Sequence, residues 1–253
     1  MGEVLYERVG AAAVITINRP ERRNAVDGPT GDALEEAYAR FVADDSARVL
    51  VLTGAGDLAF CAGADLKAIE SFAGRLSAGR SPLGFTREIS PKPTVAAISG
   101  YAVAGGFELA LWCDLRVCAE GTVFGFTERR FGVPLIDGGT QRIARVVGLG
   151  AAMDLVLTGR MVELDEAAQL GLVTRRVPAG EHLSAALELA EQLAAFPQET
   201  MLADRDALLA GLGMPLAEGI AMEARNIERT ASVAAEGGQR FTAGEGRSGS
   251  PLT

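Results

Sequence analysis

The chain has 253 residues, a formal net charge of −9 and a hydrophobic share of 48%. The acidic balance argues against a nucleic-acid-binding protein, and no apolar run approaches the ~20 residues that a membrane-spanning helix needs. The only histidine is His182, so a Ser-His-Asp triad or a two-histidine metal site is hard to build. Any catalysis is therefore expected to use carboxylates and backbone groups, without a metal ion.

The N-terminal residues and the cysteines indicate a reducing compartment. The first eight residues lack the basic region and apolar run of a signal peptide. Three cysteines without metal-like spacing do not suggest a disulfide framework. We therefore expect a cytoplasmic protein. His182 lies in a polar stretch, and we expect it at the solvated start of a helix.

Strands and helices alternate in the first half of the chain. Residues 71–91 interrupt this pattern, because they are rich in Ser, Gly, Arg and Pro and predict a mobile surface segment with at most a short helix. The pattern otherwise predicts a hairpin at 4–9 and 13–18, helices at 30–42 and 105–112, buried strands at 48–53 and 94–99, and short strands at 116–119 and 122–124.

From residue 140 onward, apolar residues recur at three- and four-residue spacing with almost no strand pattern. Strands with crossover helices followed by further helices predict an α/β core over residues 1–195. Residues 196–253 are expected to form a helical oligomerisation region, with a Gly- and Ser-rich end from 236 that frays. Helices are expected at 140–158, 164–170, 181–195, 199–211 and 215–232.

Three loops after predicted strands carry residues able to do chemistry. Residues 60–66 are small enough for backbone N–H groups to approach a ligand, although a tight turn with Asp65 as a helix N-cap would also explain them. Gly105 and Glu108 open a helix whose first N–H groups could stabilise a negative oxygen, unless Glu108 only complements the helix dipole. Glu128 precedes two arginines, so a surface ion pair is the simpler interpretation of this residue alone.

Taken in order, these segments resemble the crotonase (enoyl-CoA hydratase/isomerase) superfamily over nearly the whole chain. Each motif is weak alone, but their ordered series is specific. The matching motifs are Asn18-Arg19-Pro20, Arg23-Asn24-Ala25-Val26, residues 60–66 (Phe-Cys-Ala-Gly-Ala-Asp-Leu), residues 100–110 with Cys113-Asp114, residues 124–128 (Phe-Gly-Phe-Thr-Glu), residues 138–142 (Gly-Gly-Thr-Gln-Arg), residues 157–160 and residues 167–173.

The resemblance implies an α/β fold of the crotonase (ClpP-like) type, with repeated ββα units and a helical C-terminal region that builds homotrimers or homohexamers. It also implies acyl-CoA thioester substrates and no separate cofactor. By motif position, the backbone N–H groups of Ala64 and Gly105 would form the oxyanion hole for the thioester oxygen. Glu108 and Glu128 would hold the water and share the proton transfers, since hydratases of the family carry two such glutamates.

One loop departs from the family pattern. Residues 132–139 replace a loop that usually reads Ile/Leu-Pro-Gly-x-Gly-Gly, so Ile136 stands where hydratases usually have a glycine beside the water. Asp137 adds a third carboxylate as a possible accessory residue, and dienoyl-CoA isomerases of the family use extra acids near this place. Ala104 also replaces a glycine that many hydratases have.

Coenzyme A carries phosphates, so an acidic protein needs local cations to bind it. Arg22, Arg23 and Lys67 flank the matching loops and are the candidates, although each could be a solvated surface charge. Residues 71–91 are a candidate cover for the acyl tail. The resemblance further places Ala25, Ala62, Asp65 and Leu66 at the substrate.

Three functions compete at this point. The first is a 2-enoyl-CoA hydratase that uses Glu108 and Glu128. The second is another reaction of the superfamily, either enoyl-CoA or dienoyl-CoA isomerisation or dehydration of a specialised acyl-CoA. The third is a non-catalytic acyl-CoA-binding protein, against which the presence of both glutamates argues.

Overall fold

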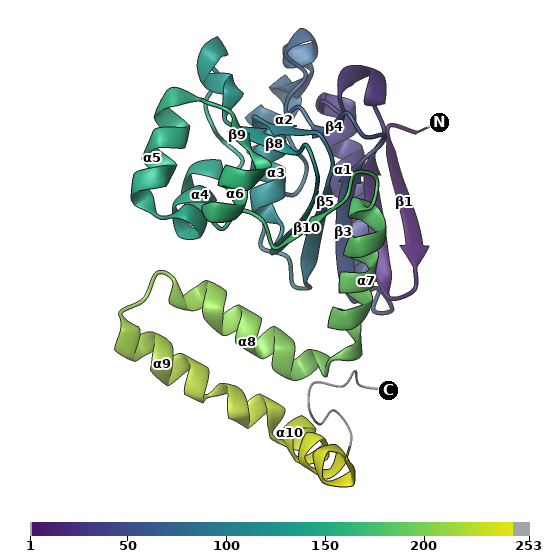
Figure 1. Ribbon diagram of the computed structural model, residues 1–253, viewed down its shortest axis with the longest axis vertical. Coiled ribbons are helices and arrows are strands. Elements are labelled where there is room, and N and C mark those ends of the chain that lie inside the picture. The colour runs from purple at the N-terminus through teal and green to yellow at the C-terminus, as the bar shows by residue number, and fades with distance from the viewer. Residues whose placement is uncertain (1, 245–253) are drawn as a thin grey trace. The chain divides into compact units, whose positions relative to one another are not determined.

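The computed structural model describes residues 2–244, and the chain forms two compact units, residues 1–190 and residues 191–253. The division falls within helix α7 (His182–Ala195), whereas the predicted boundary at residues 195–196 is the end of that helix. Both sheets belong to the first unit (Figure 1).

The first unit is built on a six-stranded and a four-stranded sheet (Figure 1). The pairs β1–β2 and β8–β9 are antiparallel, and the other neighbouring strands are parallel. The larger sheet contains, in spatial order, β1 (Val4–Val9), β2 (Ala12–Ile17), β3 (Val49–Gly54), β5 (Thr94–Ile98), β7 (Leu115–Ala119) and β10 (Arg175–Val177). The smaller sheet contains β4 (Ala59–Cys61), β6 (Tyr101–Val103), β8 (Val123–Gly125) and β9 (Val162–Glu163).

Three consecutive strand pairs each place one strand in the larger sheet and one in the smaller. These pairs are β3 with β4, β5 with β6, and β7 with β8. Helical segments follow each pair: η2 (Leu66–Phe72) and α2 (Ala73–Ser77), then α3 (Gly105–Trp112), then η3 (Thr127–Phe131) and α4 (Gly139–Val147). This repeated ββα unit is the predicted fold class, and the structure confirms it.

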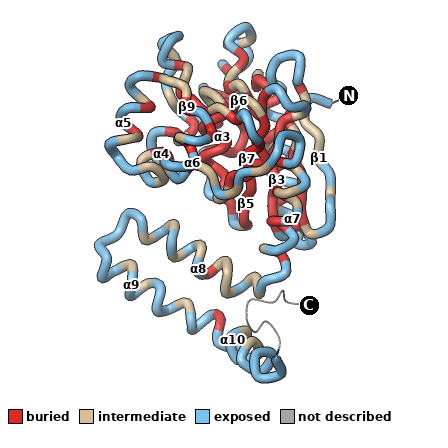
Figure 2. The backbone as a smooth tube through the Cα atoms, in the orientation of Figure 1, coloured by how far each residue is buried: buried red, intermediate tan, exposed pale blue. Residues whose placement is uncertain are grey.

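The core lies where the central strands meet the buried helices. All of β3 and β5 is buried, as is nearly all of α3, and Figure 2 shows this buried backbone in red. Helix α1 (Gly28–Ala43) packs against β1 and β2 and begins with Asp27, whose side chain accepts a hydrogen bond from the Thr30 N–H. The remaining elements of the first unit are η1 (Pro20–Arg22), α5 (Leu149–Thr158) and α6 (Leu164–Gln169).

The prediction of a surface segment at 71–91 is wrong for residues 81–86, whereas residues 87–89 are exposed as expected. Ser81, Leu83, Phe85 and Thr86 are all nearly inaccessible to solvent. The Phe85 ring lies 4.5 Å from the ring of Trp112, between centroids, and it also packs on an aromatic residue of α1. The segment is irregular chain buried by tertiary contacts, and therefore it has no periodic pattern. The short helix expected within it is α2.

The prediction of a solvated His182 is also wrong. Its side chain is 7% exposed at the start of α7, and its Nδ1 has no hydrogen-bond partner among residues 2–244. Burial lowers the pKa of this histidine, while the negative charge of Asp57 acts in the opposite direction. The polar neighbours in the sequence predicted exposure, but packing of the helix start covers the imidazole.

Two smaller features differ from the sequence expectations. Strands β9 and β10 have two and three residues, too few for a periodic pattern to reveal them. Residues 236–243, expected to fray, belong to helix α10 (Asn226–Ala243). The rest of that expectation, residues 245–253, lies outside the described part of the chain.

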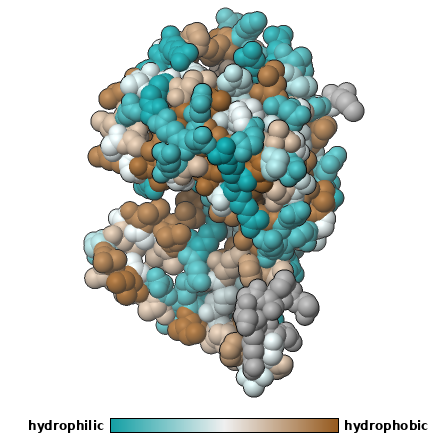
Figure 3. Space-filling model, viewed as in Figure 1, coloured by the Kyte–Doolittle hydropathy of each residue, from teal (hydrophilic) through white to brown (hydrophobic). Residues whose placement is uncertain are grey.

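The C-terminal unit is helical and exposes many apolar side chains. Helix α8 (Gln198–Gly211) packs against α9 (Leu216–Ala224) and α10. Figure 3 shows hydrophobic surface on these helices. The exposed apolar side chains of the unit include Leu208, Leu216, Ile220, Ile227 and Phe241. The predicted role of this region in oligomerisation stays a prediction. Within residues 2–244, no helix is long and apolar enough to cross a membrane.

Asn24 fixes the chain between β2 and α1 against the turn that follows β3. Its backbone has a φ of 55°, a left-handed conformation that asparagine tolerates better than most residues. Its Oδ1 accepts a hydrogen bond from the Arg19 N–H at 3.0 Å, and its Nδ2 donates to the carbonyls of Ala55 and Ala59 at 3.0 and 2.7 Å. The side chain is completely buried, and its bonds to the Arg19 N–H and the Ala59 carbonyl are buried too, so water cannot easily replace it there.

We expect Asn24→Ala to lower the free energy of unfolding by about 2–4 kcal/mol, because three backbone groups lose their partner and two of these hydrogen bonds are buried. Urea unfolding at matched protein concentration measures the change. Asn18→Ala is the control, since the Asn18 side chain makes only a solvent-exposed bond to Gly2 O, and it is expected to cost about 0.5 kcal/mol or less. Equal stability of the two variants would contradict this account of Asn24.

Candidate active site

The candidate site lies where three neighbouring parallel strands end. Strands β4, β6 and β8 are adjacent in the smaller sheet and run in the same direction, so their carboxyl ends meet at one edge. The chain after β4 carries Ala64, the chain after β6 carries Gly105 and Glu108, and the chain after β8 carries Glu128. Ligands in α/β proteins bind at such an edge. The topology therefore brings the four predicted central residues together.

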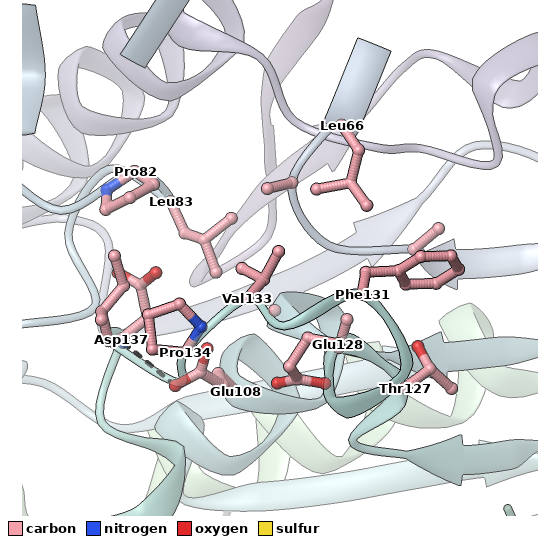
Figure 4. A pocket seen from close by; sticks show the side chains of 15 residues that line it. Leu66, Pro82, Leu83, Glu108, Thr127, Glu128, Phe131, Val133, Pro134 and Asp137 are labelled. Carbon is pink, nitrogen blue, oxygen red and sulfur yellow. Dashed lines mark hydrogen bonds between the residues drawn. The ribbon is translucent and has the colours of Figure 1, made fainter. Parts of the chain in front are cut away.

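A cavity of about 120 Å³ opens at this edge (Figure 4). Ala64, Gly105, Glu108 and Glu128 all line it, as do Ala62, Leu66, Ile136 and Asp137 from the predicted set. The sequence does not single out the other lining residues one by one; they are Pro82, Leu83, Ala104, Thr127, Phe131, Val133 and Pro134. Pro82 and Leu83 belong to residues 71–91, the candidate cover for the acyl tail, so this segment does reach the cavity.

The loops after β4 and β6 are in direct backbone contact. A Cβ on Gly63, whose φ is 84°, would lie 2.6 Å from the Gly105 nitrogen. A Cβ on Gly106 would lie 1.9 Å from the Cys61 carbonyl oxygen. Side chains at these positions would force the two loops apart. The glycines of both motifs are therefore explained by the approach of one loop to the other.

The first N–H groups of α3 point toward this junction. Gly105 is the first residue of the helix, so its N–H has no partner within the helix and carries partial positive charge. Ala104, which precedes it, has a φ of 51° and a ψ of −129°, a conformation that favours glycine. Ala104 therefore holds a conformation that an alanine side chain strains.

Glu108 is buried, and the loop between η3 and α4 fixes its carboxyl group. Its Oε1 accepts hydrogen bonds from the backbone N–H groups of Asp137 and Gly139, at 3.0 and 2.8 Å. A Cβ on Gly139 would lie 2.8 Å from the Glu108 Cγ, so only glycine allows this approach. Burial raises the pKa of Glu108 to about 8, although the two N–H donors act in the opposite direction.

Glu128 also lines the cavity, and it belongs to the 3-10 helix η3 (Figure 4). It does not form the surface ion pair that its two arginine neighbours suggested, because its side chain is buried. Its Oε2 has no hydrogen-bond partner among the described residues, and buried carboxyl oxygens rarely lack one. Burial raises the pKa of Glu128 to about 7. An unpartnered buried oxygen at a cavity is suited to bind a water or a substrate.

Ile136 and Asp137 occupy different environments in the cavity wall. The Ile136 side chain is 38% exposed and lines the cavity. The Asp137 carboxylate is buried and accepts hydrogen bonds from the Ser81 and Thr86 hydroxyls. It is thus already engaged by two donors from the segment that sequence reasoning treated as a mobile surface.

A second, basic pocket of about 250 Å³ is lined by residues before α1 and after β4. All three candidate cations, Arg22, Arg23 and Lys67, line this pocket. The other lining residues come from the same two loops and are Glu21, Ala25 and Asp65. Asp65 caps η2 by accepting a hydrogen bond from the Lys67 N–H, which confirms the N-cap interpretation. In residues 2–244, no group of three or more His, Cys, Asp or Glu side chains is arranged to hold a metal ion.

Comparisons with known proteins identify the family of the chain. The family described as enoyl-CoA hydratase/isomerase matches residues 7–245. The short-chain-enoyl-CoA hydratase of Clostridium acetobutylicum is 33% identical over 227 residues, covering 88% of this chain and 87% of the relative. The (E)-benzylidenesuccinyl-CoA hydratase of Thauera aromatica is 37% identical over 221 residues, covering 86% of each chain.

Solved structures show the same relationship. The crystal structure of enoyl-CoA hydratase from Mycobacterium tuberculosis superimposes with a TM-score of 0.88 and 36% sequence identity, over 95% of this chain and 96% of that chain. Because the family match spans most of the sequence and the shared fold includes both sheets, the chain belongs to the enoyl-CoA hydratase/isomerase family of the crotonase superfamily.

Proposed function

We propose that the protein is an enoyl-CoA hydratase, which adds water reversibly across the double bond of 2-enoyl-CoA thioesters. The observation that carries this proposal is the pair of buried carboxyl groups, Glu108 and Glu128, that line one cavity beside the start of α3. Two carboxyl groups that share a small cavity can supply both a general base and a general acid near neutral pH.

The backbone at the junction of the two loops supports stabilisation of an enolate. Attack of water at Cβ moves negative charge onto the thioester oxygen, and the N–H groups of Ala64 and Gly105 are the proposed donors to that oxygen. Both residues line the cavity, and the Gly105 N–H is the first of α3. A preorganised donor of this kind typically lowers the barrier by about 3–4 kcal/mol.

The two glutamates divide the proton transfers in this proposal. One carboxylate takes a proton from the water that attacks Cβ, and the other carboxyl group gives a proton to Cα. The unpartnered Oε2 of Glu128 supports binding of that water at Glu128. The two backbone N–H donors fix the orientation of the Glu108 carboxyl group, which supports a role for Glu108 in the other proton transfer, at Cα.

A second candidate function is enoyl-CoA or dienoyl-CoA isomerisation, and the Ile136 side chain favours it. That side chain reduces the room beside the carboxyl groups, where a water must stand for hydration. Product analysis with crotonyl-CoA and with 3-enoyl-CoA thioesters separates the two reactions, because hydration gives a 3-hydroxyacyl thioester and isomerisation gives a shifted double bond.

We expect Glu108→Gln and Glu128→Gln each to reduce the rate of crotonyl-CoA hydration by about 10²–10⁴-fold, since each removes one proton-transfer group. Loss of absorbance of the conjugated enoyl thioester measures the rate. The control is Glu120→Gln, which neutralises an exposed carboxylate paired with Arg176 and is expected to keep wild-type activity. Wild-type rates in either of the first two variants would refute the two-carboxylate mechanism.

The basic pocket supports recognition of the coenzyme A phosphates. Arg22, Arg23 and Lys67 lie together at its wall and are exposed to solvent. The residues that line it continue directly into those of the cavity, since Asp65 follows Ala64 in the loop after β4. We propose that the phosphates bind here while the thioester lies at Ala64 and Gly105.

Removing one cation should weaken binding of the nucleotide part of the substrate without affecting the chemical step. We expect Arg23→Gln or Lys67→Gln to raise KM for crotonyl-CoA about fivefold, the equivalent of about 1 kcal/mol, with kcat nearly unchanged. Crotonyl-pantetheine lacks the phosphates of coenzyme A, so its KM should not change.

Arg176→Gln, a matched loss of charge on β10, is the control variant. An equal rise in KM for both thioesters would place the phosphates elsewhere.

The exposed apolar side chains of α8, α9 and α10 support self-association through the C-terminal unit. We propose a homotrimer or homohexamer on this basis, in line with the expectation from the family. A cytoplasmic location stays a prediction.

A further inference from the structure

Arg19, from the Asn18-Arg19-Pro20 motif, is a buried charge to which the proposed chemistry gives no role. It follows β2, and only 8% of it is exposed to solvent. Burying an arginine is costly unless carboxylates and carbonyl groups satisfy its guanidinium. The partners of this guanidinium therefore indicate what the residue does.

The guanidinium of Arg19 joins the segment before α1 to the loop after β4. Its Nη1 donates to the Ala25 carbonyl at 2.6 Å, and its Nη2 lies 2.8 Å from Asp27 Oδ2. The same Nη2 lies 3.6 Å from Asp65 Oδ2, and Nε lies 3.6 Å from the half-exposed Glu3. Asp27 and Asp65 each use the other carboxylate oxygen to cap a helical segment, α1 and η2 respectively. Arg19 therefore connects the capped ends of both segments.

These contacts lie around a backbone bridge that includes Ala64. Val26 and Ala64 face each other in a parallel bridge. The Val26 N–H donates to the Gly63 carbonyl at 2.8 Å, and the Val26 carbonyl accepts from the Asp65 N–H at 2.7 Å. Because both bonds go to the neighbours of Ala64, the Ala64 N–H points away from Val26, and it has no hydrogen-bond partner among the described residues. This N–H is thus available to a ligand in the cavity that Ala64 lines.

We propose that Arg19 is a positioning residue for the oxyanion hole of the hydration reaction proposed above, which this inference presupposes. Its guanidinium holds the residues on both sides of Val26 and the residue directly after Ala64. The bridge between the two segments therefore keeps its register, and the Ala64 N–H keeps its direction toward the thioester oxygen. Arginine suits this role because its planar group binds several partners in fixed directions, whereas the ammonium of lysine is a point charge.

Arg19 acts through the loop and not on the substrate, since it lines neither the cavity nor the basic pocket. Two of its partners, Ala25 and Asp65, line the basic pocket, whereas Ala64 lines the cavity. The cations of the basic pocket do not contact its guanidinium and stay in place when it is changed. A loosened loop should therefore affect the oxyanion contact, which strengthens in the transition state, more than binding of the phosphates.

Two variants loosen the loop and leave the cations of the basic pocket in place. Arg19→Lys keeps a positive charge beside the buried carboxylates but cannot bind all the partners in fixed directions. Asp65→Asn keeps an oxygen that can cap η2 but loses the charge that faces Arg19. Arg8→Lys is the matched control, because Arg8 also joins two segments, through Asp44 and three backbone carbonyls, and lines neither pocket.

We expect Arg19→Lys and Asp65→Asn each to lower kcat for crotonyl-CoA hydration by about 10- to 100-fold, because a displaced N–H no longer meets the developing charge. KM should stay within about threefold of the wild-type value, since the phosphate contacts remain. Arg8→Lys should keep both constants. Urea unfolding of the three variants identifies effects that only reflect stability. A less stable Arg19→Lys protein with wild-type kcat would show a purely structural role and overturn the proposal.

A bound substrate analogue reports the oxyanion contact without turnover. Butyryl-CoA, isotopically labelled at its thioester carbonyl carbon, has no double bond to hydrate, and hydrogen bonds to its carbonyl oxygen lower the infrared stretching frequency. We expect the wild type and Arg8→Lys to lower this frequency equally, and Arg19→Lys and Asp65→Asn to lower it less. A wild-type shift in Asp65→Asn would overturn the proposal even if Arg19→Lys failed to fold.

The same infrared comparison separates this proposal from the proposed function. A wild type that shifts the carbonyl band but does not hydrate crotonyl-CoA would refute the proposed function, while the bands of the variants still decide the role of Arg19. A wild type that binds butyryl-CoA without any shift of the band would overturn the role of Arg19, because no oxyanion contact would then exist for it to position.

Discussion

The two N–H donors that converge on Glu108 Oε1 join the segment after β6 to the segment after β8, the two parts of the chain that carry the glutamates. They come from the loop between η3 and α4, while Glu108 itself comes from α3, which follows β6. A glycine at 139 is needed because any side chain would strike the Glu108 carboxyl group. Without these donors a buried carboxyl group in the first turn of α3 could adopt several rotamers. With them it has one orientation toward the cavity, as positioned proton transfer requires.

The same edge of the sheet explains why glycine-rich loops and buried acids occur together. The loops after β4 and β6 approach so closely that Gly63 and Gly106 cannot carry side chains, and Ala64 and Gly105 of these loops line the same cavity. A close backbone contact also excludes water from the carboxyl groups next to it. The raised pKa values of Glu108 and Glu128 follow mainly from that burial. The proposed oxyanion hole and the raised pKa values of the two glutamates thus depend on one packing arrangement.

Local patterns are sufficient to predict the elements that carry the candidate catalytic residues. The helix at 105–112 has the predicted ends, since a strand, two glycines and an apolar face specify it within a few residues. Residues 81–86 and His182 were misread because burial there depends on distant partners such as Trp112, which no local pattern shows. The side-chain contacts of Asp137 with Ser81 and Thr86 join positions more than fifty residues apart, and only the fold brings them together.

The loop at residues 132–139, which departs from the family pattern, keeps a backbone N–H donor to Glu108 and differs from the pattern in its side chains. A backbone N–H can donate to Glu108 whatever side chain its residue carries, so Asp137 supplies the donor as a glycine would. Its side chain then anchors the loop in a way that glycine cannot, through two hydroxyls of the neighbouring wall. Ile136 is free to alter the shape of the cavity, because no bond to Glu108 depends on it. Substrate preference in this protein can therefore change at position 136 while the carboxyl group of Glu108 stays in place.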